Sequence, residues 1–84
     1  MVKYIDINEK ELNIFYDRVV SNIRRIRKEK GMTQLDLSLS IGHKSTSIIS
    51  QVEAGIEDTK YNLDHLYKIA KVLEVDVRDF FNEL

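Results

Sequence analysis

Residues 33–42 read TQLDLSLSIG, and the interpretation of this stretch decides the fold. Its apolar residues alternate with polar ones, which is the period-two pattern of a half-buried strand. The surroundings favour a helix instead. Thr33 followed by Asp36 is similar to a capping box, and no neighbouring segment has the composition of a pairing strand. We therefore predict a helix over residues 33–41 that ends at Gly42.

Such a helix is apolar on two faces. Leu37 and Ile41 form one i, i+4 pair, and Leu35 and Leu39 form another. Both faces then need a covering. We expect residues 1–18, which are rich in apolar side chains, to cover Leu35 and Leu39 within the chain or in a second subunit.

Glycines mark the ends of the predicted segments, because the chain has three glycines and no proline. Before Gly31, apolar residues recur every three or four positions, which indicates an amphipathic helix over residues 9–30. Asn8 followed by Glu11 predicts a capping box at its start, and a break near Tyr16 is left open. Gly31 then lies just past its end, where a left-handed conformation costs glycine little.

Three more helical segments are expected in the second half of the chain. HKSTSIISQVEA predicts a short helix that begins near Ser45 or Thr46, so that residues 33–54 form two helices joined by a tight turn. After Gly55, steps of three and four predict a helix with Asn62 as its N-cap. The final DVRDFFNEL predicts a short helix capped by Asp76.

The composition is that of one small soluble domain. A chain of 84 residues has room for one core, and 43% hydrophobic with 32% charged residues argues against disorder. No cysteine is present, so neither disulfides nor thiolate metal sites are expected. The start, MVKYIDINEK, is too polar for a signal peptide, and no apolar run is long enough to span a membrane. We expect a cytoplasmic protein.

Charge is segregated along the chain although the net charge is only −1. Residues 24–51 carry six basic and two acidic side chains, whereas the flanking segments are acidic. A local basic surface binds polyanions whatever the overall sum. The alternative is that RRIRKEK is simply the solvated face of a helix.

Four motifs together resemble one known family. IRRIRKEKGMTQ, the spacing through LSIG, SIISQVEAG and LDHLYKIAKVLEVDVRDFF are similar to the Cro and phage-repressor type of helix-turn-helix domain, the xenobiotic-response-element (XRE) family. The resemblance implies an all-α, five-helix, lambda-repressor-like domain over residues 19–84, after an N-terminal extension over residues 1–18. It also implies that the third helix enters the DNA major groove. The turn GHKS holds one residue more than the family's common pattern, which leaves the start of that helix open by one position.

The resemblance also implies which residues contact bases. Counting back from Gly55 gives Thr46, Ser47 and Gln51, with Ile48 and Ser50 nearby. Gln51 is the strongest candidate, because glutamine can both donate to and accept from the major-groove edge of adenine. Ile48 either touches a thymine methyl or is a second core isoleucine.

Phosphate contacts would supply most of the affinity. The resemblance implies one at Gln34, in the first turn of the second helix. Lys44 and Ser45 in the turn and Lys28 on the first helix are further candidates. The resemblance also implies a partly buried ion pair between Arg27 and Glu53, the alternative being two exposed side chains of little energetic weight.

The C-terminal cluster of Phe80, Phe81 and Leu84 either closes the core or contacts a partner. We expect a homodimer, because two recognition helices about 34 Å apart reach successive major grooves. With two histidines and no cysteine, no metal site is expected. No phosphate-binding loop or nucleophile motif is present, so we expect neither an enzyme nor a cofactor.

The sequence therefore predicts a sequence-specific DNA-binding transcriptional regulator, in particular a repressor that binds an inverted repeat of double-stranded DNA as a homodimer. The alternative is a protein-interaction module, such as the antitoxin of a toxin–antitoxin pair, with a protein as its partner.

Overall fold

A computed structural model describes residues 5–56 and 58–83 of the chain. Within these ranges every regular element is helical and no strand is present, so the all-α class is confirmed. The last element is a 3₁₀ helix of five residues, so the expected count of five α-helices is not confirmed. The elements are α1 (Glu9–Glu29), α2 (Gln34–Ser40), α3 (Ser47–Glu53), α4 (Leu63–Leu73) and η1 (Val77–Phe81).

The stretch with alternating apolar residues is helical because two reciprocal hydrogen bonds between Thr33 and Asp36 cap its first turn. The Thr33 hydroxyl accepts a hydrogen bond from the Asp36 main-chain N–H at 3.0 Å, and the Asp36 carboxylate accepts from the Thr33 N–H at 3.1 Å. This capping box satisfies two main-chain donors that the first turn leaves without partners. Leu37 and Ile41 then point into the core, as expected.

The first helix, α1, is continuous, so the break that was left open near Tyr16 does not occur. Asn8 caps its start by accepting from the Glu11 N–H at 2.7 Å. Its end is followed by Gly31 at φ +71°, the left-handed conformation expected there.

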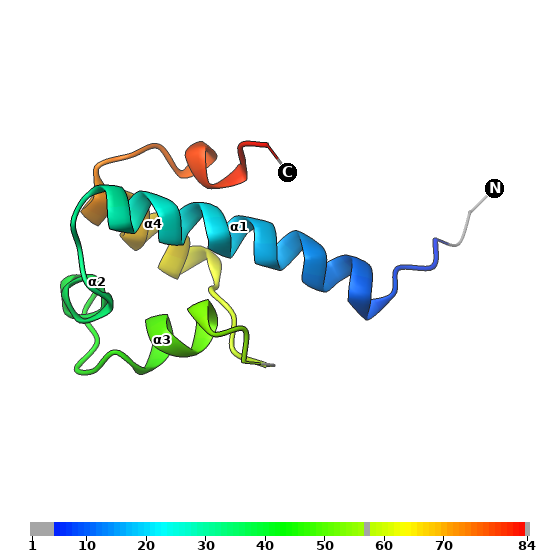
Figure 1. Cartoon of the computed structure of the whole chain (residues 1–84), viewed down its shortest axis with the longest axis horizontal. Coiled ribbons are helices and arrows are strands. Elements are labelled where there is room, and N and C mark those ends of the chain that lie inside the picture. The colour runs from blue at the N-terminus through cyan, green and yellow to red at the C-terminus, as the bar shows by residue number, and fades with distance from the viewer. Residues whose placement is uncertain (1–4, 57, 84) are drawn as a thin grey trace.

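The two halves of α1 have different surroundings. Val19, Ile23 and Ile26 are buried, whereas the side chains before Val19 are exposed except for half-buried Tyr16. Figure 1 shows this N-terminal half projecting beyond the other helices. The molecule is therefore elongated, with extents of 48 × 24 × 19 Å.

The core lies where α1 meets the other elements. α1 contacts α3 and η1, and α2 packs on α3 and α4. The buried hydrophobic residues are Val19, Ile23, Ile26, Leu37, Ile41, Ile49, Val52, Ile69, Ala70, Leu73 and Phe80.

The C-terminal segment is held on α1 by a side chain that the sequence did not single out. The Asn22 amide donates to the main-chain oxygens of Phe80 and Asn82, at 3.0 and 2.9 Å. Phe80 is fully buried in the core of its own chain, which favours the core alternative for this residue. Phe81 stays partly exposed, and Leu84 lies outside the described residues.

The second apolar face of α2 has no covering in the chain. Leu35 and Leu39 are exposed, at 45% and 53%. Figure 1 places α2 at the opposite end of the molecule from the projecting half of α1. Coverage by residues 5–18 within the same chain is therefore ruled out, because a straight helix carries these residues away from α2. Residues 1–4 lie outside the described ranges.

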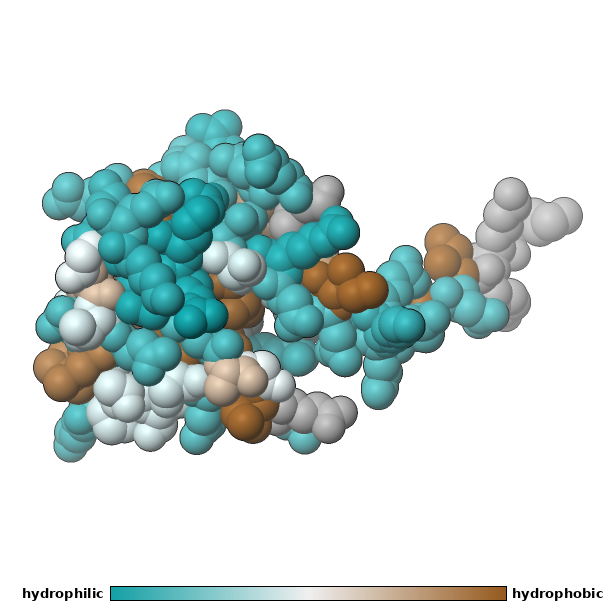
Figure 2. All heavy atoms as spheres, in the orientation of Figure 1, coloured by the Kyte–Doolittle hydropathy of each residue, from teal (hydrophilic) through white to brown (hydrophobic). Residues whose placement is uncertain are grey.

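In the view of Figure 2, polar side chains cover much of the surface, and apolar patches lie on and beside the projecting helix and also at the opposite end, where Figure 1 places α2. None of the described helices is long and apolar enough to cross a membrane.

Candidate nucleic-acid interface

A buried serine fixes the turn between α2 and α3. Ser38 is fully buried on α2, and its hydroxyl donates a hydrogen bond to the main-chain oxygen of Ser45. The His43 N–H donates back to the Ser38 oxygen at 3.0 Å. Gly42 adopts φ +96°, which lets the chain reverse there. The role of Ser38 was not predicted from the sequence. The feature that could have indicated it is a small polar residue next to a core leucine.

The third helix begins at Ser47, one residue after Thr46, the later of the two starts expected from the sequence. Thr46 is its N-cap position but makes no capping hydrogen bond through its side chain. The Ser45 hydroxyl takes over this role and accepts from the Ser47 N–H at 3.3 Å. The longer turn is thus stabilised by its own serines.

One face of α3 is buried and the other is open. Ile49 and Val52 lie in the core, and Ile48 is half-buried against it, which favours the core alternative for Ile48. Ser47 and Gln51 are exposed. The spacing of these residues follows the helical period, so burial of Ile49 and Val52 determines which side chains face outward.

Gln51 contacts the loop that follows α3. The Thr59 hydroxyl lies 3.4 Å from the Gln51 Oε1 atom and donates to it. This long contact leaves the amide nitrogen of an exposed side chain available to a ligand. Ser50 behaves differently, because its hydroxyl donates to the Ser47 main-chain oxygen at 3.3 Å.

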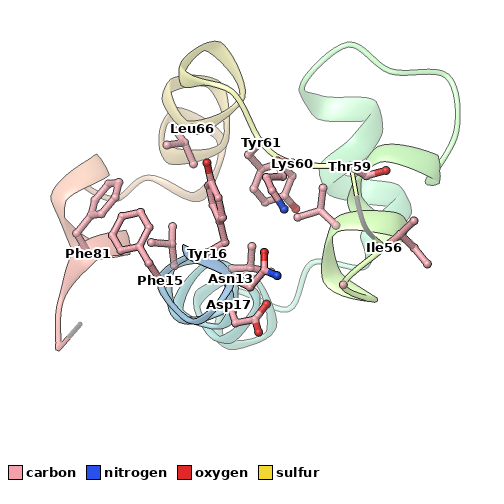
Figure 3. A pocket seen from close by; sticks show the side chains of 14 residues that line it. Asn13, Phe15, Tyr16, Asp17, Ile56, Thr59, Lys60, Tyr61, Leu66 and Phe81 are labelled. Carbon is pink, nitrogen blue, oxygen red and sulfur yellow. The ribbon is translucent and has the colours of Figure 1, made fainter. Parts of the chain in front are cut away.

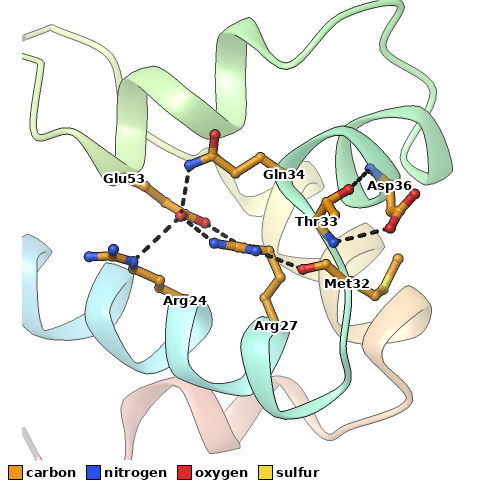
Figure 4. Close-up of polar contacts among 7 residues, drawn as sticks. All are labelled: Arg24, Arg27, Met32, Thr33, Gln34, Asp36 and Glu53. Atoms are coloured by element: carbon orange, nitrogen blue, oxygen red, sulfur yellow. Dashed lines mark hydrogen bonds and ion pairs between the residues drawn. The ribbon is translucent and has the colours of Figure 1, made fainter.

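The ion pair expected between Arg27 and Glu53 is present and connects α1 to α3 (Figure 4). Nε and Nη2 of Arg27 donate to the two carboxylate oxygens of Glu53 at 2.9 and 2.8 Å. Nη1 of Arg27 donates to the Met32 main-chain oxygen at 2.7 Å. Their side chains are only 6% and 3% exposed, so the alternative of two solvated side chains is excluded.

Two more residues converge on the same carboxylate. The Gln34 side-chain amide donates to Glu53 Oε1 at 3.1 Å, and Arg24 Nε lies 3.8 Å from that atom. Burial raises the pKa of Glu53, but the hydrogen bonds from Arg27 and Gln34 and the charges of Arg27 and Arg24 outweigh burial, and the pKa is lowered overall. Glu53 therefore stays ionised and binds α1, α2 and α3 together.

The cations of the basic segment are only partly neutralised. Arg27 is buried against Glu53, and Arg25 pairs with Glu29 at 3.2 Å. Lys28 and Lys44 are exposed, and no carboxylate among residues 5–56 and 58–83 lies within ion-pair distance of either. Arg24 is half exposed beside the end of α3, and Lys28 follows it one turn later on α1.

The structure brings most of the predicted site residues to one unit. Thr46, Ser47, Ser50 and Gln51 lie on or next to α3, and Lys44 and Ser45 lie in the turn before it. Gln34 begins α2, although its side chain turns inward to Glu53 (Figure 4). Lys28 lies on α1 at the flank of this unit. Two residues of this unit were not predicted from the sequence. Ser38 holds the turn, and Thr59 donates a hydrogen bond to Gln51.

Comparison with known proteins agrees with this geometry. A family model described as "Helix-turn-helix" matches residues 23–80, which include α2, the turn and all of α3. No curated protein sequence matches the chain.

Proposed function

The chain belongs to the helix-turn-helix family and is a DNA-binding regulator of the XRE kind, and we propose that it represses transcription as a homodimer bound to an inverted-repeat operator. The observation that supports this proposal best is the buried network around Glu53. It fixes α3 to α1 and α2 through charged hydrogen bonds, so that the outward face of α3 is presented as a rigid surface.

Base contacts are proposed at the exposed side of α3. Gln51 reads an adenine, because its amide offers one donor and one acceptor to the N7 and N6 atoms of that base. The shorter side chains of Thr46, Ser47 and Ser50 form hydrogen bonds with the edges of neighbouring bases through their hydroxyl groups. Ile48 contributes at most an edge contact to a thymine methyl, since most of its surface packs on the core.

Phosphate contacts are proposed around this helix. At Gln34 the contact is made by the main-chain N–H at the start of α2, because the side chain is engaged by Glu53. Lys44 and Ser45 bind the backbone from the turn, and Lys28 binds it from α1. These contacts set affinity and orientation, whereas α3 sets sequence preference.

Repression follows from occupancy, because a dimer seated on a promoter excludes polymerase from the same DNA. We place the protein in the cytoplasm, with no enzymatic activity and no cofactor, and we divide it into an extension over residues 1–18 and a DNA-binding domain over residues 19–84. The family match does not favour the alternative of a toxin-binding interaction module.

The test is selection of bound duplexes from a random pool by the purified full chain near physiological salt, followed by sequencing. We expect enrichment of a two-fold symmetric motif whose half-sites lie about one helical turn apart. Failure of the folded protein to enrich any motif would contradict the proposal. Enrichment of a single half-site would support DNA reading and contradict the dimer.

A further inference from the structure

The projecting half of α1 carries an apolar face that the described residues of the chain leave partly exposed. Leu12 and Phe15 are exposed at 42% and 44%, although they lie on the stripe that Val19 and Ile23 continue into the core. Figure 1 shows this half of the helix standing clear of the other elements. An apolar stripe that extends about two turns beyond its own core indicates a second packing surface.

A groove lies directly beside this stripe. It has a volume of about 420 Å³ and is formed by α1, the loop after α3, the start of α4 and η1. In Figure 3, Asn13 and Tyr16 project from α1, Phe81 and Ile56 lie on opposite sides, and Leu66 and Tyr61 lie across from α1. Phe81 and Ile56 are themselves 40% and 51% exposed, so the groove is open and apolar at its rims.

We propose that the occupant of this groove is the projecting half of α1 from a second copy of the chain. Because stripe and groove are adjacent on one molecule, a two-fold axis near residues 13–16 places each copy's stripe in the other copy's groove. One contact repeated twice then covers both surfaces and leaves neither open to further copies. This arrangement pairs the two helices antiparallel.

The position of the axis follows from the spacing of recognition helices, and in this step the inference rests on the proposed function. Arg27 marks the level at which α1 is joined to α3. At 1.5 Å per residue, Tyr16 lies about 17 Å from that level along the helix. An axis at Tyr16, perpendicular to α1, therefore separates the two Arg27–Glu53 levels by about 33 Å along α1, close to one turn of B-DNA.

The stripe and the rims of the groove expose apolar side chains that a second copy would cover. Leu12, Phe15, Ile56 and Phe81 are each between 40% and 51% exposed. Phe15 and Phe81 are expected to contribute most, because aromatic side chains bury large areas. Lys60, whose ammonium lies 4.5 Å from the Tyr16 ring centroid, adds a cation at the groove. It faces a helix whose first turn carries Glu9 and Glu11.

Sedimentation of the full chain without DNA tests the interface directly. We expect the unmodified protein to be dimeric, and Leu12→Glu and Ile56→Glu to raise the dimer dissociation constant at least tenfold. Leu63→Glu is the matched control, because Leu63 is 81% exposed in the first turn of α4 and away from the groove. Circular dichroism checks that all variants are folded.

Three results would overturn the inference. These are a monomeric unmodified protein, an equal loss of dimer in Leu63→Glu, and dimers that Leu12→Glu and Ile56→Glu leave intact. If the groove instead holds a small molecule or another protein, the unmodified protein is a monomer and binds that ligand through the same residues. Binding of each variant to a single DNA half-site is measured in parallel. A protein that fails to dimerise but binds the half-site contradicts only this inference, whereas loss of all DNA binding contradicts the proposed function.

Cross-linking locates the axis independently. The chain has no cysteine, so Asp17→Cys introduces a single thiol next to Tyr16, at the groove and beside the proposed axis. Under mild oxidation we expect it to form a disulfide between copies, because residues beside a two-fold axis approach their own symmetry mates. Ser21→Cys, exposed one turn further along α1, lies about 15 Å from its symmetry mate along the helix and is expected to stay reduced. Equal cross-linking of the two variants, or none in Asp17→Cys, would contradict the placement of the axis.

Discussion

Arg27 on α1 and Glu53 at the end of α3 form a bidentate ion pair whose side chains are almost completely buried. Every nitrogen of the guanidinium has a partner, because Nη1 donates to the Met32 main-chain oxygen. A charge pair of this kind does little for stability when complete, but removal of one partner leaves a charge without compensation.

Breaking this pair is expected to destabilise the fold. We predict that Glu53→Gln or Arg27→Met lowers the free energy of unfolding by about 3 to 5 kcal/mol, measured by urea denaturation. Arg25→Ala is the control, because the exposed Arg25–Glu29 pair contributes little and its loss should cost less than about 1 kcal/mol. Equal, small effects from Arg27→Met and Arg25→Ala would show that the buried pair does not hold α3.

Stability is expected to fall at mildly acidic pH because of His65. The His65 Nδ1 atom accepts from the Asn62 N–H at 3.1 Å, and burial first, then the charges of His43 and Lys68, lower the pKa of His65 below its ordinary value of 6.5. The unfolded chain therefore takes up a proton at a higher pH than the folded chain. The free energy of unfolding contributed by this group is fully present above pH 6.5 and is lost as the pH falls through the lower folded value.

The variant His65→Gln isolates this effect. Its side-chain oxygen can still accept from the Asn62 N–H, but it does not titrate. Urea denaturation at pH 7.5 and 5.5 should show a smaller loss of stability in the variant than in the unmodified protein. An identical loss in both would assign the pH dependence to other groups.

Lys44 is expected to contribute affinity without sequence preference. Lys44→Ala should weaken binding to all duplexes by a similar factor and reduce the slope of log affinity against log salt by about one. Lys71→Ala on α4, outside the α2–α3 unit, should leave the slope unchanged. An unchanged slope in Lys44→Ala would remove this lysine from the phosphate contacts.

The ends of the helices could be predicted from the sequence, because local side chains determine them. Thr33 and Asp36 form the expected capping box, and Asn62 and Asp76 cap the helices assigned to them. Gly31 adopts the left-handed conformation that a helix end requires. These interactions span only a few residues and are therefore visible in the sequence.

Tertiary placement could not be predicted in the same way. Phe80 and Phe81 are adjacent and chemically identical, yet only Phe80 is buried, because Asn22 on α1 binds the main chain of the 3₁₀ helix. Leu35 and Leu37 differ for a similar reason, since α3 and α4 pack on only one face of α2. The ion pair of Arg27 and Glu53 was expected only through the family resemblance, and the proposed base contacts remain predictions.

The central claim is that α3 reads DNA through Gln51, and one set of affinities tests it most directly. The unmodified protein and Gln51→Ala are each titrated with the selected operator and with operators changed at single base pairs. We predict that Gln51→Ala loses about 1 to 3 kcal/mol on the operator and no longer distinguishes the base at one position of each half-site, while discrimination elsewhere is kept. A Gln51→Ala variant that discriminates at every position as strongly as the unmodified protein would contradict the account.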